Sequence, residues 1–241
     1  MLYSMKTDKG LMRDVNQDCC FVTLFDKDTC FAVVCDGMGG PNAGDVASAI
    51  ALKNISERFV SGWRQGISEI SVKNLMTTAI SAANICVYDE AHENPNFYGM
   101  GTTAVAVYIS KNNAIIANVG DSRCYTVNTV LKQLTKDHSL VQQMIDNGEL
   151  TETDARFYPY KNIITRAIGI EEHIEIDFVE TKLEDNDKLL LCTDGLTNFV
   201  SEEEILKIIN GTEIETVAGL LIDKANNNGG GDNITAVVIS K

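Results

Sequence analysis

The chain has 241 residues, 44% of them hydrophobic and 22% charged, and its formal net charge is −14 at pH 7. This composition fits one ordinary globular domain over residues 1–241. The negative charge makes nucleic acid a poor partner, and it would also repel an anionic substrate unless a bound cation inverted the local field.

Seven cysteines occur without any Cys-x-x-Cys spacing. That pattern predicts buried, reduced thiols and argues against a disulfide framework or a cysteine zinc site. No segment approaches the length of a membrane span, and the first residues lack an apolar signal core. We therefore expect a cytoplasmic protein with no membrane partner, and a monomer by default.

The first third of the chain contains a strand pair and two helices. Apolar runs at residues 19–25 and 30–35 predict two strands joined by a turn at residues 26–28. Ala, Ile and Leu at helical spacing predict helices over residues 42–63 and 72–91.

Three strand-like runs follow at residues 103–109, 114–119 and 124–127. Their links are too short for a helical crossover, so we expect antiparallel hairpins. The remaining pattern predicts a helix that stops at Gly148, two strands, two helices and a last strand, at residues 139–147, 174–181, 188–193, 202–209, 213–226 and 234–239. Strands in clusters with helices in pairs between them favour an α+β fold in which two antiparallel sheets pack on each other and helix pairs cover the outer faces.

Two Asp-Gly pairs each follow a short buried run. Asp36-Gly37 ends the run that begins at Phe31, and Asp194-Gly195 ends the run that begins at Leu189. A carboxylate at the edge of a core is costly unless something positive meets it, and neither pair has an adjoining Lys or Arg. A metal ion shared by the two carboxylates is the natural candidate.

Three more aspartates have the same character: Asp18 precedes the first strand, Asp121 lies in a tight turn, and Asp232 opens the last strand. Carboxylates with a backbone carbonyl form an all-oxygen site, which suits Mg²⁺ or Mn²⁺. Gly37 has no Cβ and lets the backbone approach an ion closely. Two such ions can activate a bridging water and clamp a phosphoryl group, whose free oxygens Arg13 could hold.

Each feature taken alone has a plainer interpretation. A lone Asp-Gly is usually a turn, Asp232-Asn233 after glycines suits an Asx-turn, and Asp121 could pair with Arg123. Arg13 alone would be a solvated surface charge. The order and the flanking residues of the whole set are more specific than any member.

The set resembles the metal-dependent serine/threonine protein phosphatase family (type 2C) in its short bacterial form, over almost the whole chain. The motifs that carry the resemblance are, in order, residues 13–18 (RDVNQD), 34–40 (VCDGMGG), 101–103 (GTT), 120–123 (GDSR), 134–139 (LTKDHS), 164–169 (ITRAIG), 192–196 (CTDGL) and 231–235 (GDNIT). The resemblance implies an αββα sandwich with two Mn²⁺ or Mg²⁺ ions at one edge. It also implies hydrolysis of phosphoserine and phosphothreonine by a metal-bridging water, without a phosphoenzyme.

The resemblance also implies roles for individual residues. Asp36 bridges both metals and is catalytic, Gly37 contributes its carbonyl, and the remaining ligands are Asp18, Asp121, Asp194 and Asp232, with Asp121 and Asp194 holding a possible third ion. Arg13 is the catalytic phosphate-binding arginine. The partners are phosphorylated proteins, expected to be substrates of a Ser/Thr kinase.

The chain departs from the family pattern at two positions. Gln17 stands where many members have Glu, which affects the second metal, and Met38 stands where eukaryotic members have a histidine proposed as general acid. His138 is expected to begin a helix, and the general acid stays unassigned. Residues 147–164, which include Arg156, match the family's flap beside the active site, which we expect to tune substrate docking.

Other functional classes fit the chain less well. No cysteine has the Arg six residues later that a cysteine phosphatase needs, and neither Asp-Gly pair has the Asp-x-Asp of an aspartyl-phosphate enzyme. No stretch matches the twelve-residue calcium loop. A non-catalytic phosphatase fold that binds partners or signals remains the alternative, although its intact acidic cluster argues against it.

Overall fold

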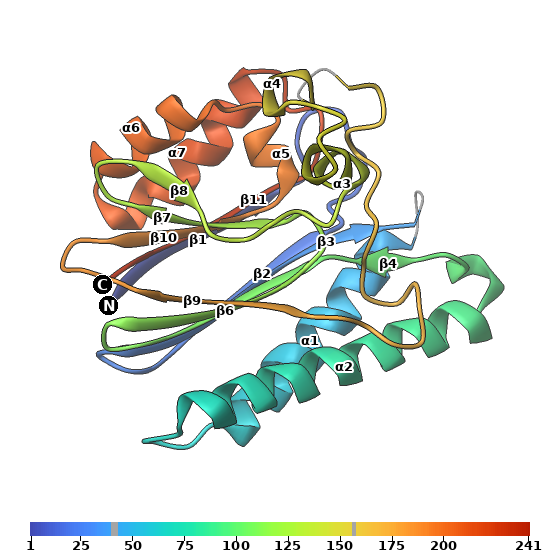
Figure 1. The fold of residues 1–241 in the computed structure, drawn as a ribbon, viewed down its shortest axis with the longest axis horizontal. Helices are drawn as coiled ribbons and strands as arrows, with labels where there is room; N and C mark the ends of the chain where they lie inside the picture. Colours follow the sequence, from blue (N-terminus) through green and yellow to red (C-terminus); the bar gives the residue numbers. More distant parts are fainter. Residues whose placement is uncertain (40–42, 156–157) are drawn as a thin grey trace.

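Two antiparallel sheets pack face to face, and a pair of helices covers the outer face of each (Figure 1). The computed structural model describes residues 1–39, 43–155 and 158–241. Gly40, Asn42 and Arg156, which belong to a predicted motif, a predicted helix start and the predicted flap, lie outside these residues. The layered architecture confirms the predicted αββα fold class.

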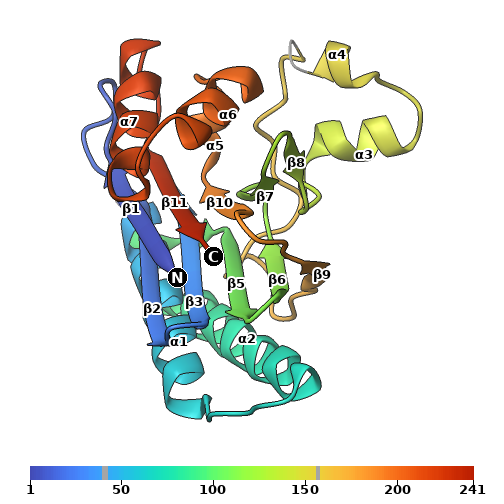
Figure 2. The same ribbon diagram turned by 90° about the vertical axis from the view of Figure 1, so that its left-hand side faces the viewer.

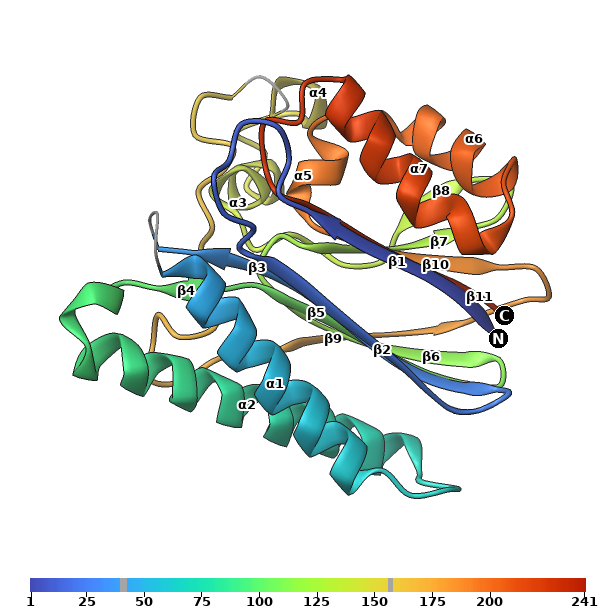
Figure 3. The ribbon, with the colours of Figure 1, turned by 180° about the vertical axis from the view of Figure 1, so that it is seen from behind.

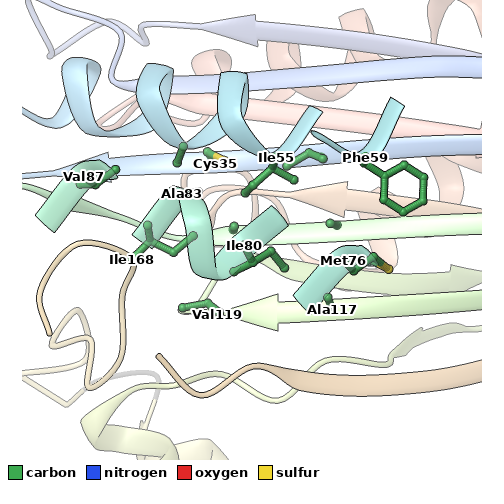
Figure 4. Packing of buried hydrophobic residues seen from close by; sticks show 14 of the residues in the cluster. Cys35, Ile55, Phe59, Met76, Ile80, Ala83, Val87, Ala117, Val119 and Ile168 are labelled. Atoms are coloured by element: carbon green, nitrogen blue, oxygen red, sulfur yellow. The ribbon is translucent and has the colours of Figure 1, made fainter. Parts of the chain in front are cut away.

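The first sheet has the strand order β2-β3-β5-β6-β9, and β4 pairs with the end of β3. The bounds of its strands are β2 (Asp18–Asp26), β3 (Thr29–Met38), β4 (Gly101–Thr102), β5 (Ala104–Ser110), β6 (Asn113–Val119) and β9 (Asp177–Lys182). The helices α1 (Gly44–Gly62) and α2 (Glu69–Glu93) cover it. Figure 4 shows Ile55 and Phe59 of α1 and Met76 and Ile80 of α2 in the core between the helices and the strands.

The second sheet has the strand order β1-β11-β10-β7-β8. The bounds of its strands are β1 (Leu2–Asp8), β7 (Arg123–Val127), β8 (Leu131–Gln133), β10 (Lys188–Cys192) and β11 (Ile234–Ser240). The helices α6 (Glu202–Asn210) and α7 (Ile214–Asn227) cover it, as Figure 3 shows from behind. A capping box between Ser201 and Glu204 fixes the start of α6, because each side chain satisfies a backbone N–H of the first turn.

Side chains that alternate along the strands fill the space between the sheets. Val105 and Val107 of β5 face Leu189 and Leu191 of β10 in one buried cluster. Strands buried on both faces explain why these segments are almost continuously apolar. β1 and β11 pair along their whole length, so both termini lie at one end of the sandwich (Figure 1).

Several predictions of local structure need correction. The link at residues 120–122 is not a hairpin, because β6 belongs to the first sheet and β7 to the second. β3 runs on through Asp36 to Met38 by pairing with β4, so the first Asp-Gly pair lies inside the strand. β9 begins at Asp177, three residues later than predicted. The edge strands β1 and β8 lack the long apolar runs that mark the central strands.

The prediction that no segment approaches the length of a membrane span was also wrong. α2 has 25 residues and is apolar enough to pass a test of length and composition. Its apolar character has a local cause, because Val72, Met76, Ile80 and Val87 face the core beneath the first sheet. Length and composition alone are weak evidence for a membrane span.

The segment predicted as the flap, residues 147–164, follows the short helix that comes after β8, and it stands beside the second sheet. α3 (Leu140–Asp146) begins at the N-cap Ser139, and Gly148 follows it with φ of +74°, as the predicted helix stop requires. A short helix, α4 (Glu152–Ala155), comes next. Figure 2 shows α3 and α4 projecting from the sandwich next to β7 and β8.

Candidate metal centre

Five aspartates from distant parts of the chain gather at the end of the sandwich away from the termini. Asp18 and Asp36 are directly paired residues of β2 and β3. Asp121 lies on the link between the sheets, Asp194 begins the short helix α5 (Asp194–Thr197), and Asp232 precedes β11. The antiparallel topology therefore brings all five predicted carboxylates to one edge.

The charges of these carboxylates act on one another. The pKa of Asp36 is raised well above its usual value of 3.8, chiefly by burial and then by the charges of Asp18, Asp194, Asp121 and Asp232. Burial is also the main cause that raises the pKa of Asp18 to about 7, of Asp121 to about 7 and of Asp194 to about 6. Such crowding of buried acids disfavours their charged forms unless a cation joins them.

Asp18 is the most enclosed of the five and is only 6% exposed. Its Oδ2 accepts hydrogen bonds from Thr193 Oγ1 and Thr235 Oγ1, both at 2.8 Å. Its Oδ1 is buried without a hydrogen-bond partner among the described residues. A buried carboxylate oxygen without a donor is costly, so this oxygen fits a hard cation.

The two Asp-Gly glycines are required by close backbone packing. A Cβ on Gly37 would lie 1.9 Å from the carbonyl oxygen of Gly44, at the start of α1. A Cβ on Gly195 would lie 1.9 Å from the carbonyl oxygen of Asn233. Each glycine thus lets a second backbone segment approach an aspartate, which adds a structural reason to the predicted approach of an ion at Gly37.

A threonine joins the Asp36 strand to the Asp121 link. Thr103 Oγ1 accepts a hydrogen bond from the Asp36 N–H at 3.0 Å and shares a second, at 2.7 Å, with Ser122 Oγ. Thr102 Oγ1 donates to the Asp36 carbonyl oxygen at 2.8 Å. These contacts orient two of the predicted ligands, and sequence reasoning gave Thr102, Thr103 and Ser122 no role.

Arg13 lies on the loop that precedes β2, and its guanidinium reaches Asp232. Nη2 of Arg13 is 3.0 Å from each carboxylate oxygen of Asp232, and the arginine side chain is 50% exposed. The loop is held by Asn233, whose Oδ1 accepts from the Gln17 N–H and whose Nδ2 donates to the carbonyl oxygens of Lys9 and Val15. Asn233 therefore anchors the arginine loop beside the carboxylates, a role that sequence reasoning also missed.

The carboxylates are neighbours but not a closed coordination shell. Across residues 1–39, 43–155 and 158–241, no three Asp, Glu, His or Cys side chains form a group that could already hold an ion. Several are turned to other partners: Asp232 faces Arg13, and Asp194 Oδ2 accepts from Asn198 Nδ2 at 3.0 Å. The all-oxygen donor set, the unpartnered Asp18 Oδ1 and the mutual repulsion of the carboxylates fit Mg²⁺ or Mn²⁺.

Comparison with known proteins decides the family. A sequence profile described as Protein phosphatase 2C matches residues 12–217. The chain belongs to the protein phosphatase 2C family. The predictions of the family, of the fold and of a metal-dependent protein serine/threonine phosphatase are thereby confirmed.

Similar members of this family come from bacteria. Serine/threonine phosphatase stp of Listeria monocytogenes serotype 4b (strain F2365) is 39% identical over 243 residues, which cover 98% of this chain and 94% of that protein. Protein phosphatase PhpP of Streptococcus pneumoniae is 36% identical and covers 100% of this chain and 97% of its own length.

Solved structures of the family match over the full fold. Serine/threonine phosphatase Stp1 from Staphylococcus aureus has a TM-score of 0.93 and 34% identity, covering 99% of this chain and 94% of that one. The catalytic domain of serine threonine protein phosphatase PstP in complex with two manganese ions has a TM-score of 0.85 and 31% identity, covering 98% and 96% of the two chains.

The position of His138 differs from what its motif suggested. It does not begin a helix, because Ser139 is the N-cap of α3, and it packs instead behind the Asp121 link with 8% of its surface exposed. Burial is the main cause that lowers its pKa below 6.5. Met38, in the place of the family's eukaryotic histidine, ends β3 opposite Gly101.

Proposed function

We propose that this phosphatase hydrolyses phosphoserine and phosphothreonine on proteins at the edge where the five aspartates meet. The single observation that carries the assignment to this edge is the convergence of Asp18, Asp36, Asp121, Asp194 and Asp232 there. Burial and neighbouring carboxylates raise the pKa values of the first four. The group needs positive charge, and a phosphorylated substrate needs the same charge to approach an acidic protein.

The ligand assignment follows the family resemblance. Asp18, Asp36, Asp194, Asp232 and the carbonyl oxygen of Gly37 would hold two Mn²⁺ or Mg²⁺ ions, with Asp36 serving both. Asp121 and Asp194 would hold a third, weaker ion. When bound, such ions neutralise charge on a phosphoryl group and lower the pKa of water to produce a nucleophile at neutral pH.

Arg13 serves the substrate rather than the metals. Its guanidinium already binds a carboxylate through Nη2, and the planar guanidinium group can bind two oxygens of a phosphate group in the same way that it binds carboxylates. When Asp232 turns to a cation, the same nitrogen is released for the oxygens of the phosphorylated residue. The half-exposed position of Arg13 leaves the guanidinium accessible to a substrate protein.

The substrates are phosphoproteins produced by a Ser/Thr kinase, and the segment at residues 147–164 selects among them beside the site. Residues 1–241 act as one catalytic domain, and the protein is a monomer in the cytoplasm, without a membrane or nucleic-acid partner. The seven free cysteines, four of them buried, are consistent with a reducing compartment.

The test is hydrolysis of a phosphothreonine peptide with and without Mn²⁺, by the wild type, Asp36→Asn and a control, Asp185→Asn. Asp185 lies near the termini at the opposite end of the sandwich and pairs with Lys241. We expect turnover that requires added metal, falls by orders of magnitude in Asp36→Asn and is unchanged in the control. Metal-independent turnover would refute the site assignment, and peptide binding without turnover would favour the scaffold alternative.

A further inference from the structure

His138 makes a reciprocal contact with Gly120, the residue before Asp121. The His138 N–H donates to the Gly120 carbonyl oxygen at 3.0 Å, and the Gly120 N–H donates to His138 Nδ1, also at 3.0 Å. Asn118 Nδ2 adds a second donor to the Gly120 oxygen at 3.2 Å. Both polar groups of the Gly120 backbone are therefore held, and one of them depends on an imidazole nitrogen.

This contact fixes the state of the imidazole ring. A nitrogen that accepts the Gly120 N–H carries a lone pair, so the neutral ring has its proton on Nε2. That nitrogen lies 3.2 Å from Asp177 Oδ2, which can accept the proton's hydrogen bond. Arg166 Nη1 lies 3.2 Å from the same Nε2 and donates to the other oxygen of Asp177 at 2.7 Å. Because arginine has no acceptor, the Nε2 proton can be accepted only by Asp177, and the arginine and the histidine share that carboxylate.

No strand pairing among the described residues holds the backbone at Gly120 in place. Its φ is +104°, which L residues rarely adopt, and a Cβ there would lie 2.6 Å from Thr103 Cγ2. The link is also where the chain crosses from the first sheet to the second, so no ladder hydrogen bond fixes its N–H. The backbone of His138 is anchored as well, because its carbonyl oxygen accepts a hydrogen bond from the Thr165 N–H at 2.8 Å.

We propose that His138 is a positioning residue for Asp121: its unprotonated Nδ1 holds the Gly120 amide and thereby sets the direction of the Asp121 carboxylate. The inference rests on the proposed role of Asp121 as a ligand of the third, weaker ion. It assigns the imidazole a hydrogen-bonding role in the turn and no proton transfer to the substrate. His138 is thus coupled to the metal centre without touching it.

Three substitutions separate the two ring nitrogens. His138→Asn retains an acceptor at the position of Nδ1 and removes the donor toward Asp177. His138→Gln moves the amide one bond outward, which favours the contact with Asp177 over the contact with Gly120. His138→Ala removes both. Thermal unfolding of each variant shows that it is folded before it is compared.

The first readout needs no metal. In the metal-free protein we expect ¹⁵N NMR to find the His138 proton on Nε2, and amide hydrogen exchange at Gly120 to quicken at least tenfold in His138→Gln and His138→Ala but less than threefold in His138→Asn. A proton on Nδ1, or equal exchange in the Asn and Gln variants, would overturn the proposal. These outcomes do not depend on what Asp121 binds.

The second readout is equilibrium Mn²⁺ binding by calorimetry. We expect Asp121→Asn to abolish the weakest class of sites, His138→Gln and His138→Ala to weaken it at least tenfold, and His138→Asn to stay within threefold of the wild type. If Asp121→Asn leaves every site intact, the proposed function of Asp121 fails while the exchange result still judges the turn. If Asp121→Asn removes the weak site and His138→Ala does not, the positioning role is refuted.

Discussion

Asp18→Asn should make the metal-free protein more stable at neutral pH while weakening its metal binding. In the folded protein the pKa of Asp18 is raised from 3.8 to about 7, chiefly by burial. A tenfold change in an acid dissociation constant corresponds to ~1.4 kcal/mol, so the buried charge opposes folding by roughly 4 kcal/mol at most above pH 7. The amide carries no charge and still offers an oxygen to Thr193 and Thr235.

The gain will be smaller than that limit. The new NH₂ group takes the place of an oxygen that has no hydrogen-bond partner among the described residues, and an unsatisfied buried donor costs about 1–3 kcal/mol. We therefore expect Asp18→Asn to raise the free energy of unfolding by about 1–3 kcal/mol in EDTA at pH 7.5. The effect should shrink at pH 5, where the folded wild type already holds a proton on Asp18.

The assay is guanidinium unfolding of the wild type and the variant, in EDTA and in saturating Mn²⁺. With Mn²⁺ the sign should reverse, because the ion stabilises the folded state in proportion to its affinity and the variant has lost a ligand. Asp185→Asn, at an exposed surface pair, is the control and should gain nothing in EDTA. A wild type as stable as Asp18→Asn in EDTA at pH 7.5 would refute the buried-charge reasoning.

Two further predictions concern the same edge of the sandwich. The pKa values of Asp121 and Asp194 are raised to about 7 and about 6, so between pH 4 and pH 7 the folded metal-free protein keeps protons that the unfolded chain has lost. The free energy of unfolding of the metal-free protein should therefore fall as pH rises through this window. The difference between the unfolding curves in Mn²⁺ and in EDTA should widen over the same range. A gap that stays constant with pH would contradict this. Gly37→Ala should lower the free energy of unfolding by about 2–4 kcal/mol, because the new Cβ would lie 1.9 Å from the Gly44 carbonyl oxygen. Gly219→Ala in α7, where nothing lies within 4 Å of the new Cβ, should raise it by about 0.5–1 kcal/mol. Equal melting temperatures for the two variants would show that the strand and helix can move apart freely.

The strands that carry the aspartates were predictable because they are buried on both faces. The runs that end at Asp36 and Asp194 are apolar, short and free of helix breakers, and both are strands in the core. The crossing at residues 120–122 was not predictable, because strand spacing limits the link but does not say which sheet the next strand joins. β1 was missed since it is an edge strand whose only buried side chain is that of Ser4.

The ligand candidates were accessible to sequence reasoning, but the residues that orient them were not. An aspartate next to glycine at the end of an apolar run stands out, whereas Thr193, Thr235 and Asn233 look like ordinary strand and loop residues. Their role depends on contacts across 175 or more positions, such as the hydrogen bond from Thr235 to Asp18. The sequence did contain one signal for the threonines. Thr193 directly precedes Asp194 in the motif at residues 192–196, and Thr235 follows Asp232 in the motif at residues 231–235.

The most direct measurement is anomalous X-ray diffraction from a crystal of this protein grown with Mn²⁺. We expect two strong peaks bridged by the Asp36 carboxylate, with Asp194, Asp232 and the Gly37 carbonyl oxygen as further ligands and Arg13 turned away from Asp232. Manganese bound only elsewhere, with Arg13 still paired to Asp232, would contradict it.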